Sequence, residues 1–188
     1  HKINETYNWT FKKNYFCVIK LIKMKKILIL VILFSTVTFA QQLESKKIFS
    51  IDVSVGDFSN DGDYLSNQIL YAPYTKGEFS GITKGQVLPV GGDFGTFYVK
   101  DNVMFMELDI DLIMLTEDGE KIHCKASGMC QWVASTFESI SSSVSWRFFT
   151  SSEKYKYLNE EVGVGFVTNA SPESGHAFHH DIYLVSQN

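Results

Sequence analysis

The chain is 188 residues long and 45% hydrophobic, which suits one domain with a sizeable core. From Gln41 onward it carries ten basic and twenty acidic side chains, a net charge of −10. A balance this acidic argues against nucleic acid and against an anionic membrane surface as partners, and it favours a neutral or cationic ligand.

The start of the chain has the pattern of an export signal. The first methionine is Met24, so residues 1–23 are interpreted as an upstream segment that is not part of the mature protein. Two lysines precede the apolar run Ile27–Phe34, and small residues stand before a cleavage site after Ala40. We therefore predict a signal peptide over 24–40 and export to the periplasm or the extracellular space. A membrane anchor is the less favoured alternative, because the apolar run is shorter than the roughly 18 to 20 residues of a spanning helix.

Two cysteines, Cys124 and Cys130, remain in the exported part. They flank Ala126–Gly128, which is predicted to form a tight turn. A hairpin there would place them opposite each other, and export permits a disulfide. Since cross-strand bridging is only sometimes allowed by geometry, a disulfide and two free buried thiols both stay open.

Alternating apolar and polar residues predict that β-strands build the domain 41–188. The segment Phe49–Val55 alternates with the period of a half-buried strand. The longest such segment, Val103–Leu115, suits a barrel wall. Tight turns are expected at Asp101–Asn102 and Asp118–Gly119. Further strands are expected at 145–149, 162–167 and 177–185, with a loop at 139–143 and one helical turn within 152–159. The pattern indicates a single all-β domain, an antiparallel barrel or sandwich.

Two stretches carry motifs whose order resembles a known family. The first runs through Lys76–Gly81 and Gly85–Asp93 to the turn at Thr116–Gly119, and the second is Tyr155–Asn159. They resemble the bacterial and fungal family called domain of unknown function 3237, whose patterns are G-x-F-x-G, G-x-V-L-P-G-G-A-D and Y-x-W-L-N. The resemblance covers nearly all of Phe49–Val185. It implies a closed antiparallel β-barrel, similar to lipocalins and allene oxide cyclase, with an interior that holds a small molecule.

The resemblance implies no settled activity, although some fungal relatives are associated with tailoring of polyketide-like molecules. Three positions depart from the family pattern: Asp111 stands where the family has Arg, Phe149 where it has Glu, and Tyr157 where it has Trp. The family's Arg and Glu are thus both missing here, which favours binding over catalysis.

Asp93 is the principal candidate for a functional side chain. It follows two glycines at a predicted strand entrance, where a carboxylate at a barrel mouth can orient or protonate a ligand. The alternative is that it caps the turn by accepting backbone N–H bonds. Gly92, Tyr157, Asn159 and Met106 are predicted to contact the ligand beside it, although packing also explains the tyrosine and the asparagine.

Three further carboxylates, Glu107, Asp109 and Asp111, share one face of the long strand. We expect this face to be the solvated outer wall, because burying three unpaired carboxylates is very costly. A pocket face, with acid–base chemistry or a bound cation, is the alternative.

The densest set of metal-ligand residue types is His176, His179 and His180. They are weak candidates for a metal site, since zinc sites usually draw ligands from several segments, and we expect no cofactor. If this segment is a strand, His180 shares a face with Ile182 and His179 lies opposite.

The sequence thus favours an exported barrel that binds a small, largely apolar molecule, with no nucleic acid, no stable membrane insertion, and a homodimer left open. One alternative is an isomerase, cyclase or lactone-forming hydrolase, with Asp93 as acid or base helped by Asp109. Another is a structural or interaction protein of the cell envelope, which an exposed apolar patch and no cavity would indicate. The expected apolar lining is Met104, Met106, Phe97, Phe148 and Phe166.

Overall fold

A computed structural model of the chain describes residues 43–64 and 67–187. The predicted upstream segment and signal peptide lie outside the described residues. Among the helices of the described part, none has the length and apolar content needed to cross a bilayer.

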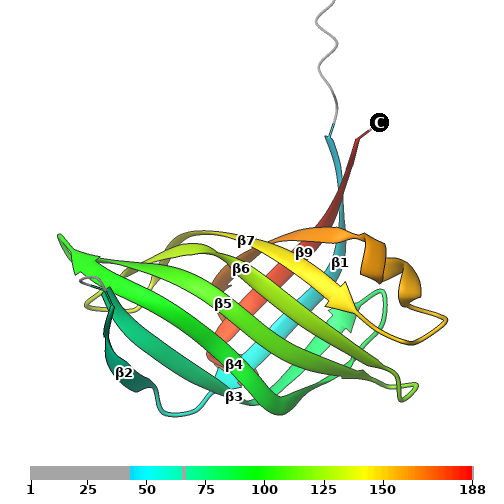
Figure 1. The fold of residues 1–188 in the computed structure, drawn as a ribbon, viewed down its shortest axis with the longest axis horizontal. Coiled ribbons are helices and arrows are strands. Elements are labelled where there is room, and N and C mark those ends of the chain that lie inside the picture. Colours follow the sequence, from blue (N-terminus) through cyan, green and yellow to red (C-terminus); the bar gives the residue numbers. More distant parts are fainter. Residues whose placement is uncertain (1–42, 65–66, 188) are drawn as a thin grey trace, which may run out of the picture. The chain divides into compact units, whose positions relative to one another are not determined.

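In these residues one antiparallel sheet closes on itself into an eight-stranded barrel (Figure 1). Closure comes from β1, which pairs with β9 on one side and with β3 on the other. The short β2 pairs with β3 outside the ring. The elements are β1 (Leu43–Val55), β2 (Ser59–Tyr64), β3 (Asn67–Gly81), β4 (Gly85–Lys100), β5 (Val103–Thr116), β6 (Lys121–Val133), β7 (Ser139–Phe149), the 3-10 helix η1 (Lys156–Glu160), β8 (Val162–Asn169), the 3-10 helix η2 (Pro172–Ser174) and β9 (Phe178–Gln187).

The alternation of apolar and polar residues in the sequence matches the alternation of inward and outward side chains in the barrel wall. In β5 every second side chain, from Met104 to Met114, is buried, while Glu107 and Asp109 are exposed. The prediction that the acidic face is the outer wall is confirmed. The two predicted turns are also present: Asp101 and Asn102 both have positive φ, as a two-residue hairpin requires, and the turn at 118–119 contains a glycine with φ of 86°.

Two local predictions are wrong. No turn forms at Ala126–Gly128, because β6 runs unbroken through it and pairs residue by residue with β5. Cys124 and Cys130 therefore lie on one strand, six positions apart, and both are free buried thiols rather than a disulfide.

The expected loop at 139–143 is the first half of β7. Serine has low strand propensity, but here its hydroxyl replaces ladder hydrogen bonds to β8. The Ser142 hydroxyl donates to the carbonyl of Val167 at 2.9 Å and accepts from the N–H of the same residue at 2.7 Å. A side chain thus completes the wall where backbone pairing between β7 and β8 stops at Val144.

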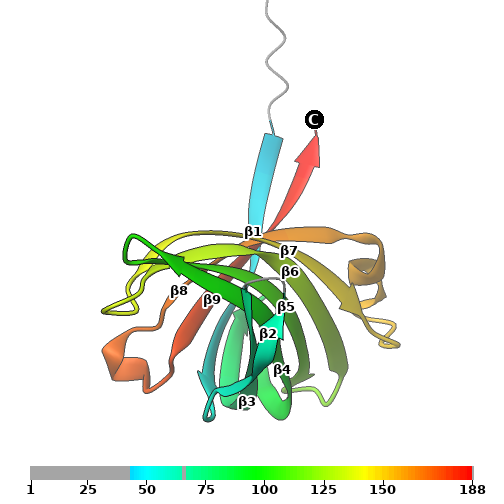
Figure 2. The same cartoon turned by 60° about the vertical axis from the view of Figure 1, so that its left-hand side comes forward.

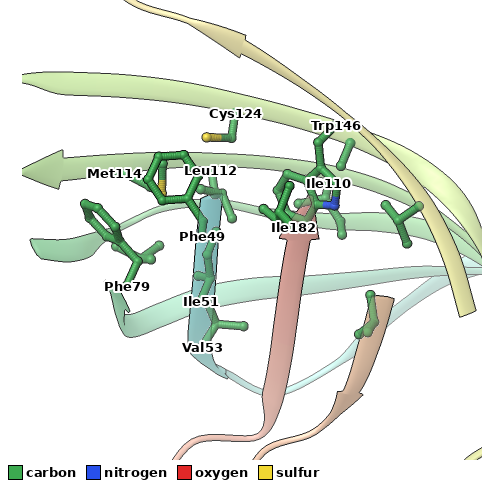
Figure 3. Close-up of a cluster of buried hydrophobic side chains, with 14 of the residues drawn as sticks. Phe49, Ile51, Val53, Phe79, Ile110, Leu112, Met114, Cys124, Trp146 and Ile182 are labelled. Carbon is green, nitrogen blue, oxygen red and sulfur yellow. The ribbon is translucent and has the colours of Figure 1, made fainter. Parts of the chain in front are cut away.

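Packed side chains fill one end of the barrel. Phe49 is fully buried, and its ring centroid lies 5.8 Å from that of Phe79 and 5.9 Å from that of Phe148. Figure 3 shows Phe49 and Phe79 beside Met114 in this cluster. Leu158 of η1 is also fully buried. Each such side chain contributes about 1.5–3 kcal/mol through burial, so this end is a packed core.

The barrel has a second end, where β6 turns into β7 and β8 turns into β9. In Figure 2 the connection between β8 and β9 lies on one side of the barrel and η1 on the other. The interior therefore has a packed end at η1 and a separate end bordered by these connections.

Candidate functional site

A pocket enters the barrel at the end away from η1. The atom-free space in it, with the open solvent at its mouth included, is about 450 Å³, and the rings of Phe58 and Phe137 at the mouth are partly exposed. Its wall is mainly apolar, and Asp93, Tyr74, Cys130 and His180 supply the polar atoms among the described residues. The apolar lining is Val55, Leu70, Ala72, Met106, Leu108, Ile110, Val167, Phe178 and Trp132.

A bulge in β4 precedes Asp93 and sets its position opposite Ile110 of β5. The register of β4 against β5 shifts between Val87 and Gly91, and Gly91 has φ of 83°. A Cβ at this glycine would stand 2.1 Å from the carbonyl oxygen of Asp111, so a side chain does not fit there. After the bulge Asp93 pairs with Ala72 of β3, and both line the pocket.

The Asp93 carboxyl group is held in a weakly solvated place. Its Oδ1 accepts a hydrogen bond from the backbone N–H of Asp109 at 2.9 Å. Burial raises its pKa to about 6, the backbone hydrogen bond opposes this rise, and the Asp109 charge adds to it. Asp93 therefore changes charge near neutral pH, which suits a residue that binds or exchanges protons with a ligand.

The charge of Asp93 raises the pKa of two other pocket groups, Tyr74 and Cys130. Burial and then Asp93 raise the pKa of the Tyr74 hydroxyl well above its ordinary value. Burial raises the pKa of the Cys130 thiol to about 11, partly opposed by the indole N–H of Trp132, which donates to Sγ at 2.9 Å. Both groups are thus neutral at physiological pH.

His180 is the most unusual polar side chain of the pocket. It is 2% exposed, and neither ring nitrogen has a hydrogen-bond partner among the described residues. Burial lowers its pKa to about 4, and His179 adds to this, while Asp52 opposes it. Its ring meets that of Trp146 edge to face at 5.5 Å. A neutral imidazole with both nitrogens unpaired is costly unless a bound molecule engages it.

A glycine on β8 leaves room for the packed rings of Trp146 and His180. A Cβ at Gly165 of β8 would stand 2.6 Å from Nε1 of Trp146. The indole therefore occupies the volume of a missing side chain and supports the His180 ring beside the pocket.

The sequence-predicted site residues fall into separate places. Asp93 and Met106 line the pocket. Gly92 is buried beneath the ring of Tyr71, on the other face of β4. Asp109 contributes its backbone N–H to Asp93, while its exposed side chain lies on the outer wall.

The expected apolar lining is also divided. Met104 is buried in the interior and Phe97 packs against the core, but neither borders the pocket. Phe148 belongs to the packed end. The prediction that Phe166 lines the pocket is wrong. Its side chain is 49% exposed, because Gly163, Gly165 and Val167 are the inward positions of β8.

Tyr155, Tyr157 and Asn159 lie at the packed end, away from the pocket. Tyr155 is buried, and its hydroxyl donates to Asp118 at 3.2 Å, whereas Tyr157 is half exposed. Asn159 clamps the end of β7: its Oδ1 accepts from the N–H of Thr150 at 2.8 Å, and its Nδ2 donates to the carbonyl of the same residue at 2.9 Å. The motif Tyr155–Asn159 therefore covers the packed end of the barrel.

We expect Asn159→Ala to lower the free energy of unfolding by about 1–2 kcal/mol, since two hydrogen bonds to Thr150 are lost. Urea unfolding followed by tryptophan fluorescence measures this. Ligand binding should be unchanged. Unchanged stability with weakened binding would contradict a structural role.

The histidines predicted as weak metal ligands point in different directions. His179 lies on the outer face, with Nδ1 2.8 Å from Asp52 and Nε2 3.0 Å from Asp181. Nδ1 of His176 lies 3.0 Å from the Ser54 hydroxyl. The expectation that His180 shares its face with Ile182, opposite His179, is confirmed. Among the described residues no group of three His, Cys, Asp or Glu side chains is arranged to hold a metal ion.

Two departures from the family pattern meet on the outer wall. Asp111 lies 2.5 Å from Nε2 of His123 and 3.3 Å from Nζ of Lys125. Burial raises the Asp111 pKa, but these partners outweigh it and hold the pKa below its ordinary value. Phe149 pairs with His123 across β6 and β7 and is exposed. Neither change reaches the pocket.

Sequence reasoning missed His180 and Tyr74 as pocket residues. The alternation of β9 places His180 inward, and that signal was available. The pocket position of Tyr74 follows from the pairing of β3 with β1 and β4, and no local pattern contains that information.

The fold and the pocket define a small closed β-barrel in which Asp93 is the acidic side chain among the described residues that line the pocket. The chain belongs to the family described as "Protein of unknown function (DUF3237)", which it matches over residues 43–185. No curated protein matches it.

Solved structures share the fold. A beta-barrel like protein from Acinetobacter baumannii AYE is 21% identical with a TM-score of 0.66, over 79% of this chain and 99% of that chain. A conserved protein of unknown function from Rhodopseudomonas palustris is 24% identical with a TM-score of 0.64, over 77% and 99%. A structure described as an enzyme from Penicillium herquei is 19% identical with a TM-score of 0.55, over 77% and 95%.

Proposed function

We propose that this barrel binds a small, largely apolar molecule whose polar group is recognised by Asp93 and His180. One observation carries the proposal: a fully buried imidazole borders an apolar pocket with both ring nitrogens unpaired among the described residues. Folded proteins rarely leave such groups unsatisfied, so the ring requires a partner, and its place beside an apolar pocket supports a bound molecule in that role. The predicted signal peptide extends the proposal to a role outside the cytoplasm.

Native mass spectrometry of the protein purified from its host tests the proposal. We expect an adduct that denaturation releases as a small molecule. Asp93→Ala should weaken the affinity at least about tenfold and so lower the occupancy, because a charge-assisted hydrogen bond is worth about 1.5–3 kcal/mol. Ala72→Phe, which fills the pocket beside Asp93, should remove the adduct. The protein mass also reports whether the chain begins at Gln41.

Two outcomes would contradict binding in this pocket. An adduct that survives in Ala72→Phe lies outside the pocket. Empty protein of the mass expected from sequence would shift the weight to a structural role in the cell envelope.

A second candidate is an acid–base enzyme of the same fold, such as an isomerase, cyclase or lactone-forming hydrolase. Two observations support it. Asp93, with a pKa of about 6, lines the same pocket as the Tyr74 hydroxyl, whose pKa it raises. One solved structure with a similar fold is described as an enzyme. Asp109 has no part in this version, since its side chain points outward. Incubating the released molecule with fresh protein separates the candidates: an enzyme yields a second species by NMR, and a binder returns the molecule unchanged.

A further inference from the structure

The charge inside the pocket is one-sided. Asp93 is the acidic side chain of the lining, and the described residues that line the pocket include no lysine and no arginine. His180, the other group able to carry positive charge, stays neutral because burial lowers its pKa to about 4. A carboxylate in an apolar place normally has a cation beside it, and this wall supplies none.

The polar atoms of the pocket also favour a ligand that donates hydrogen bonds. The one hydrogen bond that the described residues give the Asp93 carboxylate reaches Oδ1, from the Asp109 N–H. A neutral His180 offers one lone pair and one N–H, both without a partner among these residues, and the lone pair accepts from a donor on a ligand. An alkylammonium group has three N–H donors and no acceptor, which complements the Asp93 carboxylate and the lone pair of His180.

Aromatic rings also line the pocket. The ring of Trp132 lies 5.5 Å from that of Phe178 and 6.2 Å from that of Phe137, and all three line the pocket. Such rings attract a cation held over their faces. The net charge of −10 from Gln41 onward draws cations toward the domain and repels anions.

We infer that the pocket selects a cationic nitrogen: its ligand is a small aromatic or alkyl amine, and carboxylates of the same shape are rejected. This inference rests on the proposed function and narrows it to one class of ligand. The ammonium group pairs with Asp93, and the apolar part lies against Trp132 and Phe178.

Isothermal titration calorimetry with three probes of similar shape tests the inference: 2-phenylethylamine, 2-phenylethanol and 3-phenylpropanoate. At about pH 7.5 the amine is charged and Asp93 is mostly ionised. We expect the amine to bind at least about tenfold more tightly than the alcohol, and the carboxylate more weakly still. Asp93→Asn should abolish the preference. Asp109→Asn, which removes the same charge from the outer wall, should keep it.

Each other outcome overturns the inference. If the alcohol binds as tightly as the amine, or the carboxylate binds better, charge does not select the ligand. If Asp93→Asn leaves the amine affinity unchanged, the ammonium lies elsewhere. If none of the three binds at millimolar concentration, the amine class is wrong, while the native adduct and its loss in Ala72→Phe decide separately whether the pocket is used.

Discussion

Asp93→Asn is expected to raise the free energy of unfolding at pH 7 by about 2–3 kcal/mol in the ligand-free protein. The folded state raises the pKa of Asp93 from 3.8 to about 6, and each unit corresponds to about 1.4 kcal/mol. A raised pKa means that the folded state favours the protonated acid. The stability from this group is therefore fully present below pH 3.8 and is lost as pH rises through 6. Asparagine stays neutral throughout, and its Oδ1 still accepts the Asp109 N–H.

Urea unfolding of wild type and Asp93→Asn at several pH values measures the difference. We expect the gap to be widest at pH 7 and to close as pH falls below 3.8, where the wild-type carboxyl group becomes protonated in the unfolded state as well. The control Asp109→Asn should change stability by no more than about 0.5 kcal/mol, as most exposed substitutions do. A less stable Asp93→Asn at pH 7 would show that the carboxylate is paired with a cation inside the protein.

A gain in stability together with a loss of ligand binding is the usual sign of a binding site. Groups that receive a ligand are held unsatisfied in the free protein, so replacing them relaxes the fold. Both properties here come from one side chain. The stability and calorimetric experiments on the same variant therefore test whether Asp93 is retained for function.

The barrel wall was readable from the sequence because its signal is local. The alternation in Val103–Leu115 fixes which side chains face inward, and the pairs at 101–102 and 118–119 carry the backbone conformations that hairpins need. The family resemblance then supplied the closure of the sheet. These are properties of neighbouring residues or of motif order.

The errors arose where local propensity and tertiary pairing disagree. The run Ser139–Ser143 looks like a loop, but pairing with β6 and the Ser142 bridge to Val167 hold it extended. Ala126–Gly128 looks like a turn, but both neighbours of β6 continue past it. Tertiary hydrogen bonds outweigh propensities of under 1 kcal/mol per residue.

The site was only half readable for the same reason. Asp93 stands out because glycines precede it, and its position opposite Ile110 of β5 depends on a bulge that the glycines permit. Asn159 and Tyr157 stand out as motif residues, yet they lie at the packed end with η1. Motif membership reports that a position is constrained, and only the ring of strands shows which end of the barrel it constrains.

His180 gives the sharpest pH test, because its effect has the opposite sign to that of Asp93. Its folded pKa of about 4 lies below the ordinary 6.5, so its contribution is present above pH 6.5 and is lost as pH falls through 4. The loss amounts to about 3 kcal/mol at 1.4 kcal/mol per unit. Between pH 6 and 4 Asp93 adds stability while His180 removes it, and the two nearly cancel in wild type.

Two variants separate these contributions. We expect Asp93→Asn to lose stability from pH 6 to pH 4 relative to wild type, and His180→Phe, which keeps a ring against Trp146, to gain it. Both variants keep the other titratable groups around the two sites. These are Tyr74, Cys130 and Asp109 around Asp93, and His179 and Asp52 around His180. Urea unfolding at the two pH values gives the differences. Equal slopes in both variants would mean that His180 is already charged, or already paired, in the folded protein, and would remove it from the pocket's recognition of a ligand.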